Sequence, residues 1–305
     1  MWPARCLGCA RQRGSCALIL LDAIQPRGIV WLASYPKSGN TWVRAFLYTL
    51  LMSLLGTRVD NLDLDAVAYF GESDRLIEYY VPYLPDPGAV RDRAAVAMAR
   101  PKVQAAIASG SPGPVMIKTH NALIDYLGAP LVNRAVSAGA VYVLRNPLDV
   151  VISLSHFRGL TIDAAIEDMA TAGASTETND EDVYFVTSSW SEHVASWTGR
   201  PTDAILPVRY EDLLAKPTEM FTAIAAHVRM PATPEQIAHA IELTTFERMQ
   251  KAEAEKGFLE KPPHLERFFR EGRAGQWRET LTTAQIERIV ATQGEQMARF
   301  GYLPT

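Results

Sequence analysis

Short apolar runs alternate with helix-forming stretches along the chain. Four runs rich in β-branched residues have the length of buried strands, and they span residues 28–34, 114–118, 140–144 and 204–208. Helix-forming stretches occupy residues 41–55, 94–108, 148–156, 188–197 and 220–228. Pro207 weakens the fourth strand, since proline cannot donate a ladder hydrogen bond. The alternation predicts a single α/β domain with a central, mostly parallel sheet flanked by helices.

Polar and cationic side chains gather where the predicted strands end. Lys37 lies just beyond the first strand, Lys118 and His120 mark the end of the second, and Arg145 follows the third. In open parallel sheets, ligands bind beyond the carboxyl ends of the strands. We therefore expect a ligand site at this edge.

The turn after the first strand has the composition of an anion cradle. Residues 35–42 read Tyr-Pro-Lys-Ser-Gly-Asn-Thr-Trp. The start of the helix that follows offers unpaired backbone N–H groups and the positive end of a helix dipole. Small residues and hydroxyl donors would line such a cradle, and Lys37 would add a full charge. Taken alone, the same residues also fit a tight turn with a helix N-cap.

This turn is not a Walker A loop. That motif places its lysine after the second glycine, whereas Lys37 precedes the single Gly39. No predicted strand ends in an aspartate of the Walker B kind, because the third strand leads into Arg145. A Mg²⁺-dependent nucleoside triphosphate site is therefore poorly supported.

Three blocks in order resemble motifs of the cytosolic-type sulfotransferase family. Residues 35–42 are similar to its YPKSGTTW loop, residues 145–153 (RNPLDVVIS) to its RNPxDxxxS motif, and residues 269–277 (FREGRAGQW) to its RKGxxGxW segment. Smaller matches fall between them at 118–120 (KTH), 190–197 (WSEHVASW), 210–212 (YED) and 244–246 (TTF). Agreement of several motifs in the same order argues against chance.

The resemblance implies a sulfotransferase that uses 3′-phosphoadenosine-5′-phosphosulfate (PAPS) as co-substrate, releases 3′-phosphoadenosine-5′-phosphate (PAP) and needs no metal. It implies transfer of a sulfuryl group to a hydroxyl or amine of a small molecule or natural product. The implied catalytic residues are His120 as general base, with Lys37, Lys118 and Ser153. The implied donor-binding residues are Lys37, Ser38, Gly39, Asn40, Thr41, Trp42, Arg145, Ser153, Tyr210, Thr244, Phe246, Arg270, Glu271 and Gly272.

Two positions depart from the family pattern. Asn40 stands where the loop often has threonine, and Glu271 replaces the usual lysine, which removes one positive charge. Arg273 is expected to compensate in part. Arg145, taken alone, would also fit a surface ion pair with Asp149.

Composition and charge exclude several classes of function. The net charge of −4 over 305 residues gives no reason to expect a nucleic-acid partner. The longest apolar stretch, residues 45–55, is too short for the ~20 residues of a membrane span. The three cysteines, Cys6, Cys9 and Cys16, lie near the start, so no disulfide can form in the body, which suits a reducing cytoplasm. Residues 1–26 are expected to be a disordered extension, and residues 27–305 the sulfotransferase domain.

Two rival interpretations and the acceptor stay open at this point. A small-molecule kinase would use the same cradle for a triphosphate, and a nucleotide-binding module would have lost catalysis. Loops at 62–111, 158–185 and 250–265 would line an acceptor pocket, and their aromatic residues would suit an apolar or aromatic acceptor. The sequence does not indicate which acceptor is used or what the oligomeric state is.

Overall fold

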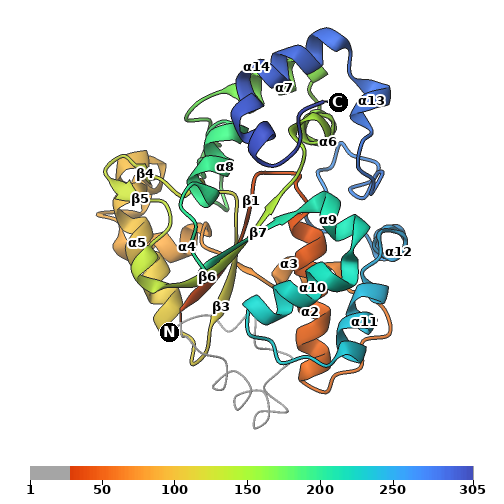
Figure 1. Cartoon of the computed structure of the whole chain (residues 1–305). Coiled ribbons are helices and arrows are strands. Elements are labelled where there is room, and N and C mark those ends of the chain that lie inside the picture. The colour runs from red at the N-terminus through yellow and green to blue at the C-terminus, as the bar shows by residue number, and fades with distance from the viewer. Residues whose placement is uncertain (1–27, 305) are drawn as a thin grey trace.

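A five-stranded parallel sheet forms the centre of the molecule (Figure 1). The computed structural model describes residues 28–304, so the expected extension at 1–26 lies outside the described residues. The strands are β1 (Ile29–Ser34), β2 (Glu72–Ser73), β3 (Val115–Thr119), β6 (Ser137–Leu144) and β7 (Ile205–Arg209), in the order β2-β3-β1-β6-β7. Every pairing in this sheet is parallel, which confirms the predicted fold class.

The predicted strand with Pro207 is present in the sheet, and one short strand was not predicted. Pro207 lies in β7, an edge strand, where a proline costs no ladder hydrogen bond on the open side. The short strand β2 was not predicted, since two residues in a stretch rich in glycine, proline and charge carry no periodicity. A separate antiparallel pair, β4 (Asp125–Tyr126) and β5 (Ala129–Pro130), lies within the connection between β3 and β6.

Helices cover both faces of the sheet (Figure 1). The chain up to residue 170 supplies α2 (Asn40–Leu54), α3 (Leu64–Tyr69), α4 (Ile77–Tyr80), α5 (Arg93–Ser109), α6 (Pro147–Arg158) and α7 (Ile162–Ala170). The rest of the chain supplies α8 (Trp190–Thr198), α9 (Tyr210–Ala215), α10 (Pro217–His227), α11 (Pro234–Leu243), α12 (Phe246–Lys256), α13 (Trp277–Thr280) and α14 (Thr283–Arg299). Among residues 28–304, none of these helices is both long and apolar enough to cross a membrane.

The two faces of the sheet bury separate cores, as the period of two in a strand requires. Trp31 and Ala33 of β1 point into a core shared with α5, α6, α8 and α14. Leu32, between them, points into the opposite core, where α2, α10 and α11 pack on β6 and β7.

The register brings the carboxyl ends of the three central strands level with one another. Ala33 pairs with Thr119, and Ser34 pairs with Val143. The residues that follow these strands therefore leave the sheet at one edge. This edge is where the sequence predicted a ligand site.

We expect Phe46→Ala to lower the free energy of unfolding by ~3–5 kcal/mol, because it removes a fully buried ring from the core under α2. The Phe46 ring centroid lies 4.3 Å from that of Phe221, which would face the resulting cavity. Met98→Ala is the control, since Met98 is 57% exposed, and its effect should stay within about 0.5 kcal/mol. Urea unfolding of both variants tests this, and equal midpoints would contradict the assigned core.

Candidate functional site

One large cavity of about 1560 Å³ opens at the carboxyl edge of the sheet. All but two of the residues singled out from the sequence line it: Lys37, Gly39, Asn40, Thr41, Trp42, Lys118, His120, Arg145, Ser153, Tyr210, Phe246, Arg270, Glu271 and Gly272. Ser38 and Thr244 are fully buried behind the wall. The Thr244 hydroxyl donates to the Ala240 carbonyl at 2.7 Å, so it caps a helix.

The turn between β1 and α2 has a backbone conformation that few residues tolerate. Lys37 has φ 68° and Gly39 has φ 106°, both in the left-handed region. A Cβ on Gly39 would lie 2.7 Å from Cδ2 of the Tyr210 ring. Glycine is therefore required at position 39, and the strained Lys37 is of the kind found at functional sites.

Several buried polar atoms around this turn have no hydrogen-bond partner within residues 28–304. They are Oγ of Ser38, Oδ1 of Asn40, Nε1 of Trp42 and Nε of Arg145. Buried polar groups are normally hydrogen-bonded, so a group of orphaned ones marks a place where a ligand would complete the bonding. Trp42 and Arg145 both line the cavity, which fits a polar ligand with anionic groups.

Lys37 places its ammonium group between two aromatic rings. The Nζ atom lies 4.1 Å from the ring centroid of Phe157 on α6 and 4.2 Å from that of Phe268. Such cation–π contacts hold a cation without neutralising it. Burial, followed by the neighbouring Lys118 and Arg145, lowers the pKa of Lys37 to about 7. The charge of Lys37 therefore changes near neutral pH.

Lys118 forms an ion pair that the sequence did not predict. Its Nζ atom lies 3.2 Å from both carboxylate oxygens of Glu260, and one of those oxygens also accepts from Arg44 at 2.7 Å. Burial lowers the pKa of Lys118 to about 8, against the opposing effect of Glu260. The two cations lower the pKa of Glu260 to about 2, so this carboxylate is ionised under all ordinary conditions.

His120 is held in one tautomer by a backbone contact. Its Nδ1 atom lies 2.8 Å from the Ser34 carbonyl oxygen, and a carbonyl only accepts, so Nδ1 carries the proton. The other ring nitrogen, Nε2, is then free of a proton and can act as a base. Burial, followed by the charge of Lys118, lowers the pKa of His120 well below its usual value. His120 is therefore neutral at physiological pH.

A second buried histidine supports the backbone of the first. His193 on α8 donates from Nε2 to the His120 carbonyl at 3.2 Å, and its Nδ1 accepts from the Tyr142 hydroxyl at 2.9 Å. Burial lowers the pKa of His193 to about 3, so it stays neutral. The chain Tyr142–His193–His120 ties the end of β3 to α8 and β6.

Arg145 connects the anion cradle to the C-terminal segment. Its guanidinium donates to the carbonyls of Lys37 at 3.3 Å and Arg273 at 3.0 Å, and lies 4.5 Å from the Tyr210 ring centroid. The alternative ion pair with Asp149 does not form. Asp149 instead accepts from the backbone N–H groups of Gly275 at 2.7 Å and Trp277 at 3.1 Å. Residues 145–153 and 269–277 therefore lie together.

Residues 270–273 close one side of the cavity. Glu271, the departure from the family pattern, pairs with Arg270 at 3.2 Å and with Arg273 at 3.1 Å, so it offsets both charges. Gly272 has φ 62°, and a Cβ there would lie 2.2 Å from the Phe246 ring. This close approach places the backbone of Gly272 directly against an aromatic face.

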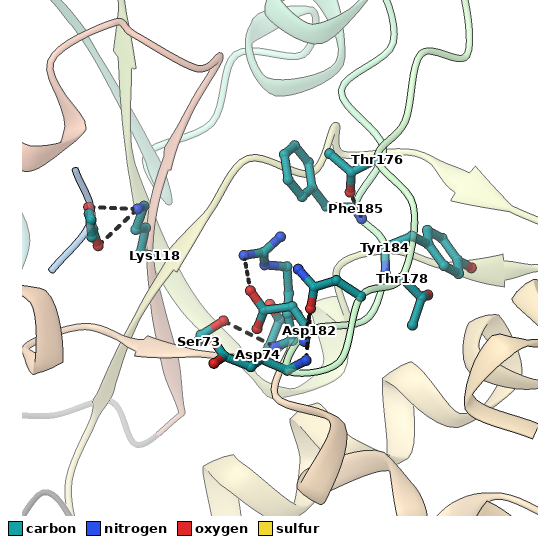
Figure 2. A network of polar contacts seen from close by, with 12 residues as sticks. Ser73, Asp74, Lys118, Thr176, Thr178, Asp182, Tyr184 and Phe185 are labelled. Carbon is teal, nitrogen blue, oxygen red and sulfur yellow. Dashed lines mark hydrogen bonds and ion pairs between the residues drawn. The ribbon is translucent and has the colours of Figure 1, made fainter. Parts of the chain in front are cut away.

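Some cavity residues were missed from the sequence. Phe157 lies four residues after Ser153 on α6, so helical spacing could have indicated it. Arg44 follows the cradle on α2 but carries no motif. Glu260 lies in the loop 250–265, which was expected to line the acceptor pocket, but it was not singled out. Arg75, whose charge acts on Lys118, pairs with Asp182 at 2.6 Å and lies 4.8 Å from the Phe185 ring centroid; Asp182 and Phe185 are labelled in Figure 2. No group of three or more possible metal ligands occurs within the described residues.

The chain matches the family described as "Sulfotransferase domain" over residues 28–301, and it therefore belongs to that family. The resemblance noted from the sequence motifs is thus confirmed. Flavonol 3-sulfotransferase of Flaveria bidentis is 24% identical over 287 residues, which cover 89% of this chain and 82% of that relative. Cytosolic sulfotransferase 10 of Arabidopsis thaliana is 25% identical over 265 residues, covering 85% and 74% respectively.

Solved structures share the fold. A mouse sulfotransferase crystallised with PAP superimposes with a TM-score of 0.59 at 20% identity, covering 93% of this chain and 90% of that one. A retinol dehydratase in complex with retinol and PAP also gives 0.59, at 21% identity, covering 91% and 83%.

We expect the cradle to bind sulfate more weakly as the pH rises from 6 to 8, because Lys37 loses its proton through a pKa of about 7 while sulfate stays a dianion. Lys37→Met should remove the part of this dependence centred near pH 7. Lys251→Met is the control, since the Lys251 side chain is 76% exposed. Calorimetry at fixed ionic strength measures the sulfate dissociation constant at each pH. The same pH dependence in Lys37→Met as in the wild type would refute Lys37 as the titrating group.

Proposed function

We propose that this protein transfers a sulfuryl group from PAPS to a hydroxyl or amine of a small acceptor by in-line displacement, with His120 as general base. The observation that carries the proposal is the large cavity at the edge of the sheet. It combines an anion cradle, two lysines and a neutral histidine whose Nε2 is free to accept a proton.

The residues present fit the donor. The backbone and side chains of residues 37–42 would hold its 5′ end, and Arg145, Ser153, Arg270 and the Gly272 backbone would hold the 3′-phosphate. Trp42, Tyr210 and Phe246 would surround the adenine. Orphaned donors on Trp42 and Arg145 support this, since each would gain a partner on binding. Thr245, rather than Thr244, lines the cavity beside Phe246, so it is the threonine that we assign to the adenine pocket.

The chemistry needs positioning and charge stabilisation rather than covalent catalysis. The acceptor oxygen or nitrogen forms a bond to sulfur while the bond from sulfur to the bridging oxygen of the donor breaks. The acceptor proton goes to Nε2 of His120. The electron pair of the broken bond stays on the bridging oxygen of the departing PAP, where the ammonium group of Lys37 stabilises the developing charge.

The surroundings of His120 suit a general base that takes up one proton from the acceptor. Its lowered pKa keeps it neutral before the reaction, so Nε2 is ready to accept. The hydrogen bond from Nδ1 to the Ser34 carbonyl then stabilises the imidazolium ion, since that bond strengthens when the ring is charged. The contact from His193 to the His120 backbone fixes the position of the ring.

A small organic molecule is the acceptor class that we infer. Relatives of this chain are named for flavonols and for amines, and a structural neighbour was crystallised with retinol. In this chain, Tyr69, Tyr79, Val81 and Phe185 are among the apolar residues that line the cavity, so an acceptor with an apolar body would fit. A cytoplasmic location stays a prediction, supported by the similarity to a cytosolic relative.

We expect the protein to transfer radiolabelled sulfate from PAPS to members of a panel of phenols, alcohols and amines in the presence of a chelator. His120→Ala should lower kcat by ~10²-fold or more, because it removes the base. His239→Ala is the matched control, since His239 is exposed and its ring nitrogen Nε2 lies 3.1 Å from the Val59 carbonyl oxygen, outside the cavity lining. Full activity of His120→Ala would overturn the assigned role, and no transfer by the wild-type protein to any acceptor would overturn the proposed function.

A further inference from the structure

One carboxylate in the cavity joins three segments that are far apart in the sequence. Glu260, from the segment that follows α12, contacts Lys118 at the end of β3 and Arg44 on α2. Figure 2 shows Lys118 projecting from its strand, with both contacts of its ammonium group drawn as dashed lines. The side chains of Lys118 and Glu260 are each 25% exposed, and that of Arg44 is 1% exposed. All three line the cavity.

Glu260 is the only carboxylate that contacts either cation in the described part of the chain. Arg44 donates from Nη1 to Glu260 at 2.7 Å, whereas its Nε and Nη2 have no partner among residues 28–304. An exposed ion pair contributes little, but breaking a buried one leaves an uncompensated charge that is costly. Loss of the Glu260 charge would leave the buried Arg44 and the partly buried Lys118 as neighbouring cations without a counter-charge.

The groups around Lys118 are otherwise basic. Arg44 on α2, Arg75 after β2 and Lys37 in the cradle all repel its charge, and His120 lies two residues further along the chain. The carboxylate of Asp182 is engaged by Arg75 at 2.6 Å (Figure 2). Among the described residues, therefore, only Glu260 offsets the charge of Lys118 by direct contact.

Resting on the proposed function, we propose that Glu260 is a positioning residue of the sulfuryl-transfer site. Its carboxylate holds Lys118 as an ammonium ion at a fixed place beside His120, where Lys118 faces the group being transferred. Arg44 orients the carboxylate from the other side. Nothing in the motifs of the sequence assigns a role to Glu260 or Arg44.

The direction of the pH effect follows from the charges. Burial, Arg44 and Arg75 lower the pKa of Lys118, and Glu260 raises it, with a net value of about 8. A lysine is charged below its pKa and loses its proton as the pH rises through that value. Removing the Glu260 charge takes away the raising effect, so Lys118 would lose its proton at a lower pH. Glu260 also raises the pKa of Lys37, so the alkaline fall of kcat, which both lysines set, should move to lower pH, and a titration of Lys118 itself isolates its share.

The test compares Glu260→Gln with Glu266→Gln in the full chain. Gln preserves the shape of the side chain, and Glu266 lies in the same segment with 90% of its side chain exposed. With PAPS and an acceptor both saturating, the alkaline fall of kcat in Glu260→Gln should begin about one pH unit lower than in the wild type, or lower still. At pH values above this fall, kcat should therefore be about tenfold smaller than that of the wild type. The PAP dissociation constant at pH 6.5 should stay within about twofold. Glu266→Gln should match the wild type in both.

Two outcomes would overturn the inference while leaving the proposed function standing. One is a pH profile of Glu260→Gln that coincides with that of the wild type. The other is a weaker PAP affinity that accounts for the whole loss with the alkaline limb unmoved, since Glu260 would then merely anchor its segment.

The effect of Glu260 on the pKa of Lys118 can also be measured without turnover. NMR titration of ¹³C-methylated lysines, with Lys118→Arg identifying the signal, should show Lys118 titrating at a lower pH in Glu260→Gln than in the wild type. An unchanged titration would refute the inference, even if no acceptor were known.

Discussion

Repulsion among buried cations is the constraint on which this site depends. Lys37, Lys118 and Arg145 leave three neighbouring strands at one edge because the parallel register brings those strand ends level. Burial lowers the pKa values of both lysines, and neighbouring cations add to it: Lys118 and Arg145 act on Lys37, and Arg44 and Arg75 act on Lys118. Each cation is then stabilised differently: Lys37 by two aromatic faces, Lys118 by a carboxylate and Arg145 by backbone carbonyls. Only one of the three meets a full negative charge, so the edge remains receptive to anions.

The segment between α12 and α13 contacts all three cations. Phe268 supplies a ring to Lys37, Glu260 pairs with Lys118, and the carbonyl of Arg273 accepts from Arg145. The segment is itself held by Asp149, which accepts two of its backbone N–H groups. This segment therefore forms a wall of the cavity. Its position depends on contacts with the same basic groups that would bind the donor.

The sequence predicted the parallel sheet and its ligand edge because both depend on local patterns. Short apolar runs, glycine in the first turn and basic residues at strand ends are visible without any long-range contact. The strand β2 and residues Arg44 and Phe268 were not predicted, and Glu260 was expected only as part of the loop 250–265, without a role of its own. Their positions depend on how an irregular segment packs against distant helices, and such packing leaves no periodic signal. Ser38 and Thr244 carry family motifs, yet their side chains lie behind the cavity wall, since a motif shows which residues are present and not where they point.

The central claim is that this edge of the sheet is a site for a nucleotide with a 3′-phosphate. Calorimetric titration with PAP in the absence of Mg²⁺, with 5′-AMP and ATP as controls, tests it most directly. The account predicts that PAP binds tightly, that removal of the 3′-phosphate weakens binding strongly, and that Mg²⁺ has no effect. Failure to bind PAP, or a preference for ATP with Mg²⁺, would contradict the account and favour a kinase.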